Sequence, residues 1–585
     1  MSAPVTVCIL PPPGPNAARG VAYPDYIREI LDHAGLYYET VAPDDLAGAL
    51  LGTRLLVTVG DGDLPDDARA ALGEWVRGGG AWLAVGGAGG VPELLGVAAE
   101  SPAYSTFGGG RCALGEGYLR LDHPLHPVLD GVHGPLHFFG GTAFRTAGGT
   151  CIAGVLDRHQ RDARRAGIVE TAPGEGHCLL IAADVTGTVV RIQQGVAVTR
   201  DGVSAPDGTA PVADGVLKSD DGAVLDWDFD RRPVPGAPGF SAFLHPVADL
   251  WREILLRGIF HLARQARVSV PLLWLYPRNL PALAHMSHDT DGNDAALGRL
   301  LLAVLKEAGI LSTWCVIVPG YDYDLISEIA AAGHELATHF DAMSEGTEFT
   351  EEQFDAQRRI LVRLFGEAPV TNKNHYLRWE GDTRFFEWLA AGGIQLDQSK
   401  GASKTGEAGF NFGTCHPFFP LDTQGRALDV LELPTPTQDL HIFAPPSLVP
   451  PLLDAVCRSH GVLHLLFHPA HIAKDGVAES LRSAVREAEA RGLEWWTARR
   501  LNDWERARRA ARWSGYAEDA NGARATLDVP EKLESATVLW LHPASVPVRV
   551  NGATAETATV QRWGFAFQSV VLDAPGRSEI TLFGP

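Results

Sequence analysis

The sequence has few of the features that mark membrane, nucleic-acid-binding or disulfide-rich proteins. It contains no apolar run that approaches the roughly 18 residues needed to cross a bilayer. Lysine and arginine number 49 against 71 aspartates and glutamates, which gives a formal charge of -22. A nucleic-acid partner or an anionic membrane surface would need a basic face. The composition therefore predicts a protein with neither kind of partner.

Paired cysteines and a secretion signal are also missing. The seven cysteines are scattered singly with no CxxC pair, a pattern typical of reduced thiols. The first residues carry no basic segment, and the apolar stretch at residues 5–10 is too short for a signal sequence. We therefore expect a cytoplasmic protein; the sequence does not indicate its oligomeric state.

What is present is a long chain with an ordinary globular composition. Its 585 residues are 45% hydrophobic and 21% charged, and a chain of this length is expected to form about three or four domains. Short apolar runs alternate with helical patterns near the start, which predicts a flavodoxin-like α/β domain with a parallel sheet over residues 1–195. The expected strands are residues 5–10, 37–41, 55–60 and 81–87, followed by a hairpin over residues 167–183.

This first part resembles the class I glutamine-amidotransferase-like fold. Domains of that fold carry a nucleophilic cysteine in a Gly-x-Cys-x-Gly turn after a central strand. The matching turn here is residues 86–90, and Ala88 stands at the cysteine position. Alanine has no nucleophilic atom, so we expect the turn to serve packing or the close approach of a ligand. One alternative places the function in this domain as a ligand-binding unit. We assign no function to His123 or His126.

Regular alternation returns after an irregular segment. Residues 196–265 are predicted to contain that segment and a connecting helix from about residue 247. Residues 266–508 alternate strands with helices and predict a (β/α) barrel, whole or incomplete, with its chemistry at the C-terminal ends of the strands. Residues 515–585 alternate apolar and polar residues and predict a small antiparallel β domain. Within the barrel the expected strands are 283–287, 312–318, 335–340, 428–433 and 462–467, and the expected helices are 295–308, 323–332, 350–365, 383–392 and 447–460.

Polar residues with metal-binding side chains follow several of these strands. Asp289 and Asp291 come after an apolar run and would point to the same side of an extended segment. Two carboxylates at one spot are costly without a cation or a shared proton. His339, a polar aromatic loop at 372–379 and His468 would lie at the same edge. A carboxylate with imidazoles is what a zinc hydrolytic site needs.

These segments resemble the polysaccharide deacetylase domain (NodB homology, carbohydrate esterase family 4) over about residues 270 to 500. The resemblance implies a base at Asp289, metal ligands at Asp291 and His339, an acid at His468, and an arginine that orients the base at Arg378. It also implies a divalent metal, expected to be zinc, with cobalt or nickel as alternatives.

The sequence departs from this family at one metal ligand. The family has a second metal histidine four residues after the first, where this chain has Met343. A thioether is a poor ligand beside carboxylates. His375 is the first replacement, because its polar loop is expected near the same edge, and Asp341 and His416 are lesser candidates.

Structural roles are the competing interpretation for these residues. Asp289 and Asp291 could cap a helix or form a surface turn. For the remaining candidates, packing or support is the default over substrate contact. These are His334, His464, His471, Trp379, Trp388, Trp495 and Trp496.

The resulting prediction is a metal-dependent hydrolase of amide C–N bonds whose substrate is an N-acetylated sugar or a related small amide. The main alternative is a catalytically inactive carbohydrate-binding or scaffolding protein with a degenerate deacetylase domain. Met343 favours the alternative, whereas the joint presence of Asp289, Asp291, His339 and His468 favours the enzyme.

Overall fold

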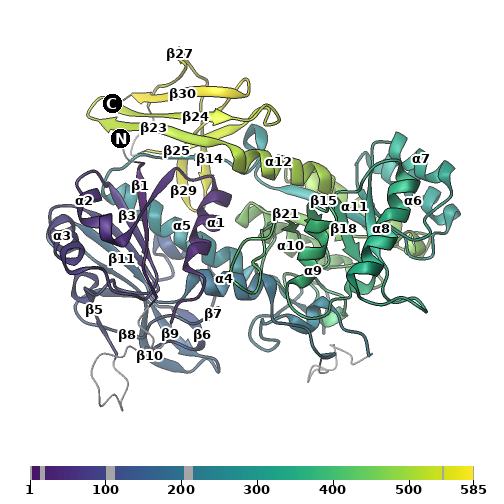
Figure 1. Ribbon diagram of the computed structural model, residues 1–585, viewed down its shortest axis with the longest axis horizontal. Helices are drawn as coiled ribbons and strands as arrows, with labels where there is room; N and C mark the ends of the chain where they lie inside the picture. The colour runs from purple at the N-terminus through teal and green to yellow at the C-terminus, as the bar shows by residue number, and fades with distance from the viewer. Residues whose placement is uncertain (1–2, 13–19, 101–111, 203–214, 543–545, 584–585) are drawn as a thin grey trace. The chain divides into compact units, whose positions relative to one another are not determined.

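The computed structural model describes residues 3–12, 20–100, 112–202, 215–542 and 546–583, and each of its two units combines separate stretches of sequence (Figure 1). Unit 1 comprises Met1–Val189, Leu250–Asn279 and Glu505–Pro585; unit 2 comprises Val190–Asp249 and Leu280–Trp504. The units therefore combine segments that lie in different parts of the four-part division expected from the sequence.

A parallel sheet forms the N-terminal part of unit 1. Its strands run in the order β2-β1-β3-β4-β11 and are all parallel. The apolar strands β3 and β4 are buried along their whole length, as expected for parallel strands covered on both faces. This confirms the predicted parallel sheet, while the likeness to the amidotransferase fold stays a prediction. The elements are β1 (Val5–Ile9), α1 (Ile27–Ala34), β2 (Tyr38–Val41), α2 (Leu46–Ala49), β3 (Leu55–Val59), α3 (Asp66–Arg77), β4 (Ala81–Val85) and β11 (His177–Ile181).

The same sheet continues with antiparallel strands beyond β11. The order there is β11-β10-β9-β6-β7, and β10 with β11 forms the hairpin expected over residues 167–183. The strands are β5 (Val97–Ala99), β6 (Glu116–Leu121), β7 (Leu136–Phe139), β8 (Phe144–Thr146), β9 (Thr150–Asp157) and β10 (Asp162–Thr171), and α4 (Val185–Gln194) follows β11.

Helix α5 (Val247–Gln265) packs against this sheet through a glycine. A Cβ added to Gly258 would lie 3.1 Å from the side chain of Leu179 and 3.4 Å from that of Leu83, so the helix backbone approaches β11 and β4 closely. The indole of Trp251 donates a hydrogen bond of 2.7 Å to the carbonyl of His137. The helix that was expected to be a connector is thus part of the core of unit 1 from Leu250 onward.

The C-terminal strands form antiparallel sheets, as expected, but they are not built from the C-terminal segment alone. One sheet has the order β14-β25-β29-β28, and β14 (Val270–Leu273) comes from the middle of the chain. The ring of Phe260 on α5 lies 5.7 Å from that of Trp563 and 5.2 Å from that of Phe567. The remaining strands are β23 (Arg512–Asp519), β24 (Gly522–Val529), β25 (Thr537–Leu541), β26 (Val548–Val550), β27 (Ala553–Thr554), β28 (Ala558–Arg562), β29 (Phe565–Val571) and β30 (Gly576–Phe583).

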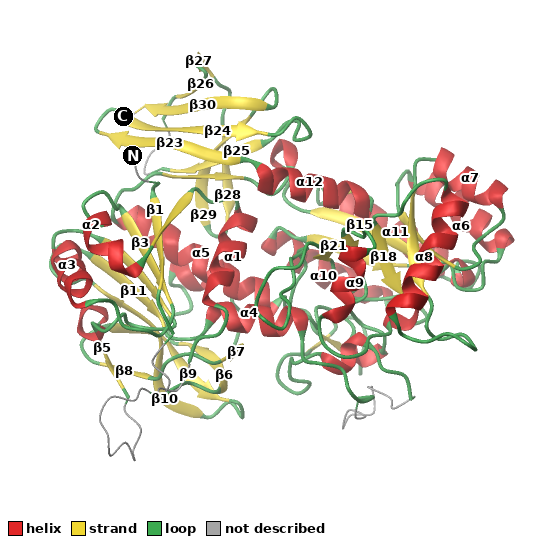
Figure 2. Cartoon of the chain, viewed as in Figure 1, coloured by secondary structure: helices red, strands yellow, loops and turns green. Residues whose placement is uncertain are grey.

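Unit 2 is a parallel sheet with helices around it, which corresponds to an incomplete barrel (Figure 2). The strand order is β20-β19-β18-β17-β16-β15-β21, with β22 paired to β15, and among the described residues β20 and β21 do not pair with each other. The strands are β15 (Leu283–Asp289), β16 (Thr313–Ile317), β17 (Glu335–Phe340), β18 (Thr371–Asn374), β19 (Leu396–Asp397), β20 (Leu431–Glu432), β21 (Val462–Leu466) and β22 (Glu494–Trp495). The helices are α6 (Ala295–Ala308), α7 (Tyr323–Ala331), α8 (Glu351–Phe365), α9 (Arg384–Ala391), α10 (Val449–Ser459), α11 (Val477–Ala490) and α12 (Ala498–Ala510), the last of which ends in unit 1.

Two parts of unit 2 differ from the sequence expectation. The polar loop expected at 372–379 contains strand β18, whose side chains are buried and hydrogen-bonded rather than exposed. The strand expected at 428–433 is reduced to β20. In the irregular segment, the described residues form only the turn η5 (Ser219–Gly222) and the short strands β12 (Arg232–Pro233) and β13 (Ser241–Ala242).

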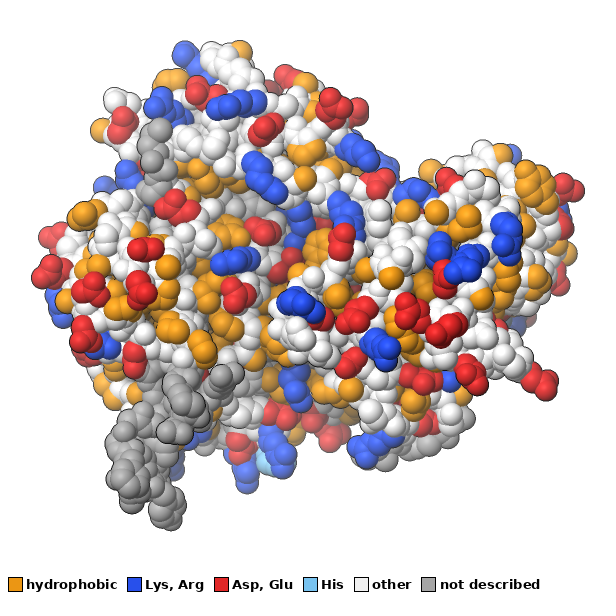
Figure 3. Space-filling model, in the orientation of Figure 1, with side chains coloured by type: hydrophobic (Ala, Val, Ile, Leu, Met, Phe, Trp, Pro, Cys, Tyr) orange, Lys and Arg blue, Asp and Glu red, His pale blue; other side chains and the backbone are white. Residues whose placement is uncertain are grey.

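One face of the molecule carries charged side chains of both signs (Figure 3). On the face drawn in Figure 3, acidic and basic side chains are interspersed. Among the described residues, none of the helices is both long enough and apolar enough to cross a membrane.

Candidate metal site

The topology of unit 2 brings the polar strand ends together. Strands β21, β15, β16, β17 and β18 are neighbours in that order and all run parallel, so their C-terminal ends share one edge of the sheet. Asp289 is the last residue of β15, His339 is the next-to-last residue of β17, and His468 follows β21 by two residues. These three residues therefore lie at the same edge of the sheet, as the sequence predicts.

Asp291, His339 and His375 form a group whose potential ligand atoms all lie within 4.8 Å of one another. The Nε2 atom of His339 is 3.4 Å from Oδ1 of Asp291, and Nε2 of His375 is 3.7 Å from the same oxygen. Asp291 adopts a left-handed backbone conformation with φ of 35°. The predicted replacement for the histidine missing at Met343 therefore lies beside the other two predicted ligands.

Each histidine of this group is held through its other ring nitrogen. Nδ1 of His339 is 2.9 Å from the carbonyl oxygen of Lys373, and Nδ1 of His375 is 3.0 Å from Oδ1 of Asp341. A carbonyl and a carboxylate both accept a proton from Nδ1, so the lone pair of each ring is placed on Nε2, which faces Asp291. Asp341, a lesser candidate for the third ligand, thus orients His375 from behind.

Two atoms at the centre of the group are buried without a hydrogen-bond partner among the described residues: Oδ1 of Asp291 and Nε2 of His339. Burial alone would raise the pKa of Asp291, but a hydrogen bond from protonated His339 and the charges of protonated His468, His339 and His375 lower it to about 2, so the facing atoms need either a proton or a cation between them. An ionised carboxylate oxygen and an imidazole lone pair that face each other and lack donors fit a bound cation. The donor set of one carboxylate and two imidazoles suits zinc and its neighbours in the first transition row.

Asp289 is paired with a lysine that sequence reasoning missed. Nζ of Lys373 lies 3.2 Å from Oδ1 of Asp289 and donates a 2.5 Å hydrogen bond to Oγ of Ser287. Both charged side chains are buried, Lys373 completely. Lys373 stands in a short strand between two asparagines, where no apolar alternation marks a buried position. In the sequence, only the position of Lys373 between α8 and the next expected helix indicated that it could lie near the site.

Arg378 does not orient Asp289. Its guanidinium contacts the carboxylate of Glu380 at 2.5 Å, the carbonyl oxygen of Ala342, and the sulfur of Met343 at 3.9 Å. The prediction from the resemblance is wrong for this contact, because the adjacent Glu380 pairs with the arginine and Lys373 already occupies the position beside Asp289. Met343 therefore lies next to Arg378.

His468 is held by an aspartate from another loop. Nδ1 of His468 is 2.5 Å from Oδ2 of Asp439, whose same oxygen is 2.9 Å from Nδ1 of His471. The other ring nitrogen, Nε2, faces Asp289 at 4.0 Å and Asp291 at 3.9 Å. Burial alone would lower the pKa of His468, but Asp439 and the two site carboxylates raise it to about 9. The imidazole is thus protonated at neutral pH, with one N–H directed into the site.

The remaining candidates have structural contacts. His416 lies in a different group, with Asp249 and Cys415, and its Nε2 contacts the carbonyl of Ser459. His334 contacts Ser312, and His464 lies between Ser287 and the carbonyl of Pro434. The buried residues Trp379, Trp495 and Trp496 confirm the default of core packing, whereas Trp388 is half-buried beside Phe349 and Phe385.

Comparison with known proteins gives matches among solved structures only. No family model matches the chain. No curated protein matches it either. The similar structures include a candidate polysaccharide deacetylase from Mycobacterium smegmatis, with 20% identity over 40% of this chain and 92% of that chain and a TM-score of 0.32. The allantoinase Puue has 16% identity over 39% of this chain and 91% of that chain, with a TM-score of 0.31. The peptidoglycan N-acetylglucosamine deacetylase Bc1960 has 16% identity over 38% of this chain and 89% of that chain, with a TM-score of 0.26.

Proposed function

We propose that the protein is a divalent-metal-dependent hydrolase that cleaves the amide C–N bond of a small N-acyl substrate. The observation that carries the proposal is the pair of buried atoms, Asp291 Oδ1 and His339 Nε2, that face each other without a donor between them. Asp289 and His468 stand on the same site as a carboxylate and a protonated imidazole. A base, an acid and a cation-binding group at one edge are the parts that amide hydrolysis requires.

Asp291, His339 and His375 would hold the metal, with zinc expected and cobalt or nickel as alternatives. Three protein ligands leave coordination positions for water and substrate. When bound, the ion would lower the pKa of a water molecule and polarise the carbonyl of the amide.

Asp289 is the group that we assign as general base. Its Oδ1 lies 3.2 Å from the buried ammonium of Lys373, and Ser287 accepts a hydrogen bond from that ammonium. The carboxylate can therefore take a proton from an attacking water while its negative charge remains compensated.

His468 is the group that we assign as general acid. Asp439 accepts the proton of Nδ1, so Nε2 directs a proton into the site when the ring is in its doubly protonated form. The amine that leaves an amide must be protonated, and a histidine whose pKa is raised to about 9 holds its proton at neutral pH. Asp289 and His468 thus divide the two proton transfers between them.

The first substrate class that we propose is an N-acetylated amino sugar, and the second is another small amide such as a cyclic one. A polymer is not required by the contacts of the site. The inactive alternative, a carbohydrate-binding protein, differs from both in that its site would hold no metal.

Measurements of metal content and of hydrolytic activity test this proposal. The wild-type protein and Asp291→Ala would be purified with added zinc, measured by mass spectrometry, and assayed against N-acetyl sugars and cyclic amides. We expect Asp291→Ala to lose one metal equivalent and all amide hydrolysis. Asp475→Ala is the matched control, because Asp475 is an exposed acid of the same unit. Equal metal content in wild type and Asp291→Ala would overturn the metal site and favour the binding protein.

A further inference from the structure

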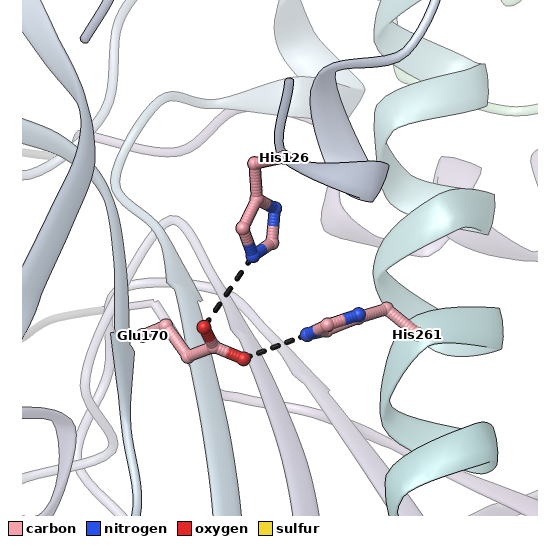
Figure 4. A group of neighbouring side chains, drawn as sticks. All are labelled: His126, Glu170 and His261. Carbon is pink, nitrogen blue, oxygen red and sulfur yellow. Dashed lines mark hydrogen bonds and ion pairs between the residues drawn. The ribbon is translucent and has the colours of Figure 1, made fainter. Parts of the chain in front are cut away.

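Unit 1 contains a second group of metal-binding side chains, His126, Glu170 and His261. Figure 4 shows them converging from a loop, a strand and a helix. Nε2 of His126 lies 3.4 Å from Oε2 of Glu170 on β10, and Nε2 of His261 on α5 lies 2.6 Å from Oε1 of the same carboxylate. One ligand atom from each of the three residues lies within 4.8 Å of the others. The two imidazoles thus bind opposite oxygens of one carboxylate.

The local structure orients these rings before any ligand binds. The backbone N–H of Val128 donates to Nδ1 of His126 at 3.3 Å, which directs Nε2 of His126 toward Glu170. In the neutral ring this bond leaves the proton on Nε2, so a metal bound to Nε2 would shift that proton to Nδ1 and break this long bond. The ring centroids of His126 and His261 are 4.9 Å apart. The side chains of His126 and His261 are 14% and 13% exposed, and that of Glu170 is 26% exposed, so an ion can reach the group from solvent.

Gln265 creates a conflict that hydrogen bonds alone do not resolve. Its Nε2 lies 3.0 Å from Oε1 of Glu170 and 2.9 Å from Nε2 of His261, and those two atoms are 2.6 Å apart. In a triangle of three close polar atoms around an ionised carboxylate, at least one side must join two donors or two acceptors. Turning the amide over moves the conflict to the Gln265–Glu170 side without removing it.

The amide oxygen of Gln265 is a second unexplained atom. Oε1 is buried and has no hydrogen-bond partner among the described residues. A cation between the groups, with the amide turned so that its oxygen takes the present place of Nε2, removes the conflict in the triangle, because the amide oxygen, the carboxylate and both imidazole nitrogens would then present lone pairs to it. Two imidazoles with oxygen ligands are a donor set that zinc accepts in tetrahedral sites.

We propose that His126, Glu170 and His261 bind a divalent transition-metal ion, zinc first, with the amide oxygen of Gln265 as a fourth ligand. The ion would fasten α5 to β10 and to the loop before η4 (Pro127–Leu129). This site lies entirely in unit 1 and does not depend on the function proposed for unit 2.

The test uses the full chain carrying Asp291→Ala, so that the site of unit 2 does not contribute. Metal-free protein would be titrated with zinc by calorimetry, and with cobalt while its visible absorption is recorded. We expect one equivalent to bind, the cobalt spectrum to show tetrahedral coordination, and zinc to raise the Tm by several degrees.

The added substitution Glu170→Gln should abolish all three signals while keeping the size of the side chain. His126→Ala serves as a second variant, because it changes a loop and leaves strand and helix intact. His123→Ala is the matched control, since His123 is an exposed histidine of the same loop. Zinc binding that persists in folded Glu170→Gln and His126→Ala proteins, or no binding in folded Asp291→Ala protein, would overturn the proposal.

Discussion

At the scale of single residues, the structure changes which cation stabilises Asp289. The resemblance points to Arg378 because an arginine loop performs this task in the deacetylase family. Here the ammonium of Lys373 occupies that place, and Arg378 is paired with Glu380. A lysine makes fewer directed contacts than a guanidinium, and Ser287 accepts one of its protons.

The contrast between the two cations gives the first prediction. Lys373→Met should lower kcat by about 10²-fold, because Asp289, the proposed base, loses the buried cation that lies 3.2 Å from it. It should also lower the free energy of unfolding by about 3 kcal/mol, because a buried carboxylate is left unpaired. Arg378→Gln should cost less than about 1 kcal/mol, because its ion pair is partly exposed. Steady-state kinetics measure kcat, and urea unfolding measures the free energy of unfolding. A larger loss of kcat in Arg378→Gln than in Lys373→Met would show that Arg378, not Lys373, orients Asp289.

Asp439 gives the second prediction. With Asp439 in place, the pKa of His468 is raised to about 9, so the acid stays protonated through neutral pH. Asp439→Asn removes the charge that has the largest raising effect, so the pKa of His468 should fall. Activity that depends on protonated His468 should then be lost at a lower pH than in the wild type. The pH profile of kcat measures this shift, and an unmoved alkaline limb would exclude His468 as the acid.

At the scale of secondary structure, the elements with strong local signals are those that could be predicted. Helix α6 has the predicted bounds because Asp294 caps its first turn and Gly309 ends it in a left-handed conformation. Strand β17 also has the predicted bounds. Strand β18 was missed, since its residues Thr371–Asn374 are all polar and buried, and neither alternation nor an apolar run identifies such a strand.

The residues of the site also differ in whether a local sequence motif identifies them. Asp289, Asp291, His339 and His468 are found from motifs that surround them at strand ends. Lys373 and Asp439 have no such motif. Asp439 reaches His468 from 29 residues away. Long-range pairs of this kind depend on how loops return to the sheet edge, which local spacing does not encode.

The polar strand gives the third prediction. Nδ2 of Asn372 donates a 2.8 Å hydrogen bond to Oδ1 of the buried Asp397 on β19. Asn372→Ala would leave that oxygen with fewer donors and should lower the free energy of unfolding by about 1–3 kcal/mol. Urea unfolding measures the loss. Glu352→Gln, at an exposed position on α8, is the control and should change stability by less than about 0.5 kcal/mol. An equal effect in both variants would contradict a structural role for the bond.

At the scale of the whole molecule, the C-terminal strands depend on residues from the middle of the chain. Strand β14 supplies an edge of the β14-β25-β29-β28 sheet, and Phe260 of α5 contacts the rings of Trp563 and Phe567. The segment from residue 515 is therefore not expected to fold by itself, although its sequence pattern suggests a small domain.

Deletion and substitution supply the fourth prediction. A peptide of residues 515–585 should lack the cooperative thermal unfolding of a folded domain, measured by circular dichroism. In the full chain, Phe260→Ala should lower the free energy of unfolding by about 3–5 kcal/mol, because the buried ring fills the space between α5 and these strands. Leu51→Ala, whose side chain is 95% exposed, is the control. A stable, cooperatively unfolding peptide would contradict the shared core.

The discontinuous units also set an order of folding during synthesis. The chain crosses between the units after residues 189, 249, 279 and 504. The ribosome releases every strand of unit 2 before it has made β25, the partner that β14 of unit 1 requires. Strand β14 must therefore wait without its partner while residues 274–536 are translated. A nascent chain stalled after residue 504 has left the ribosome, but before β25 has, should hold a folded unit 2 and an unfinished unit 1, and that interval is when chaperone binding to α5 would matter most.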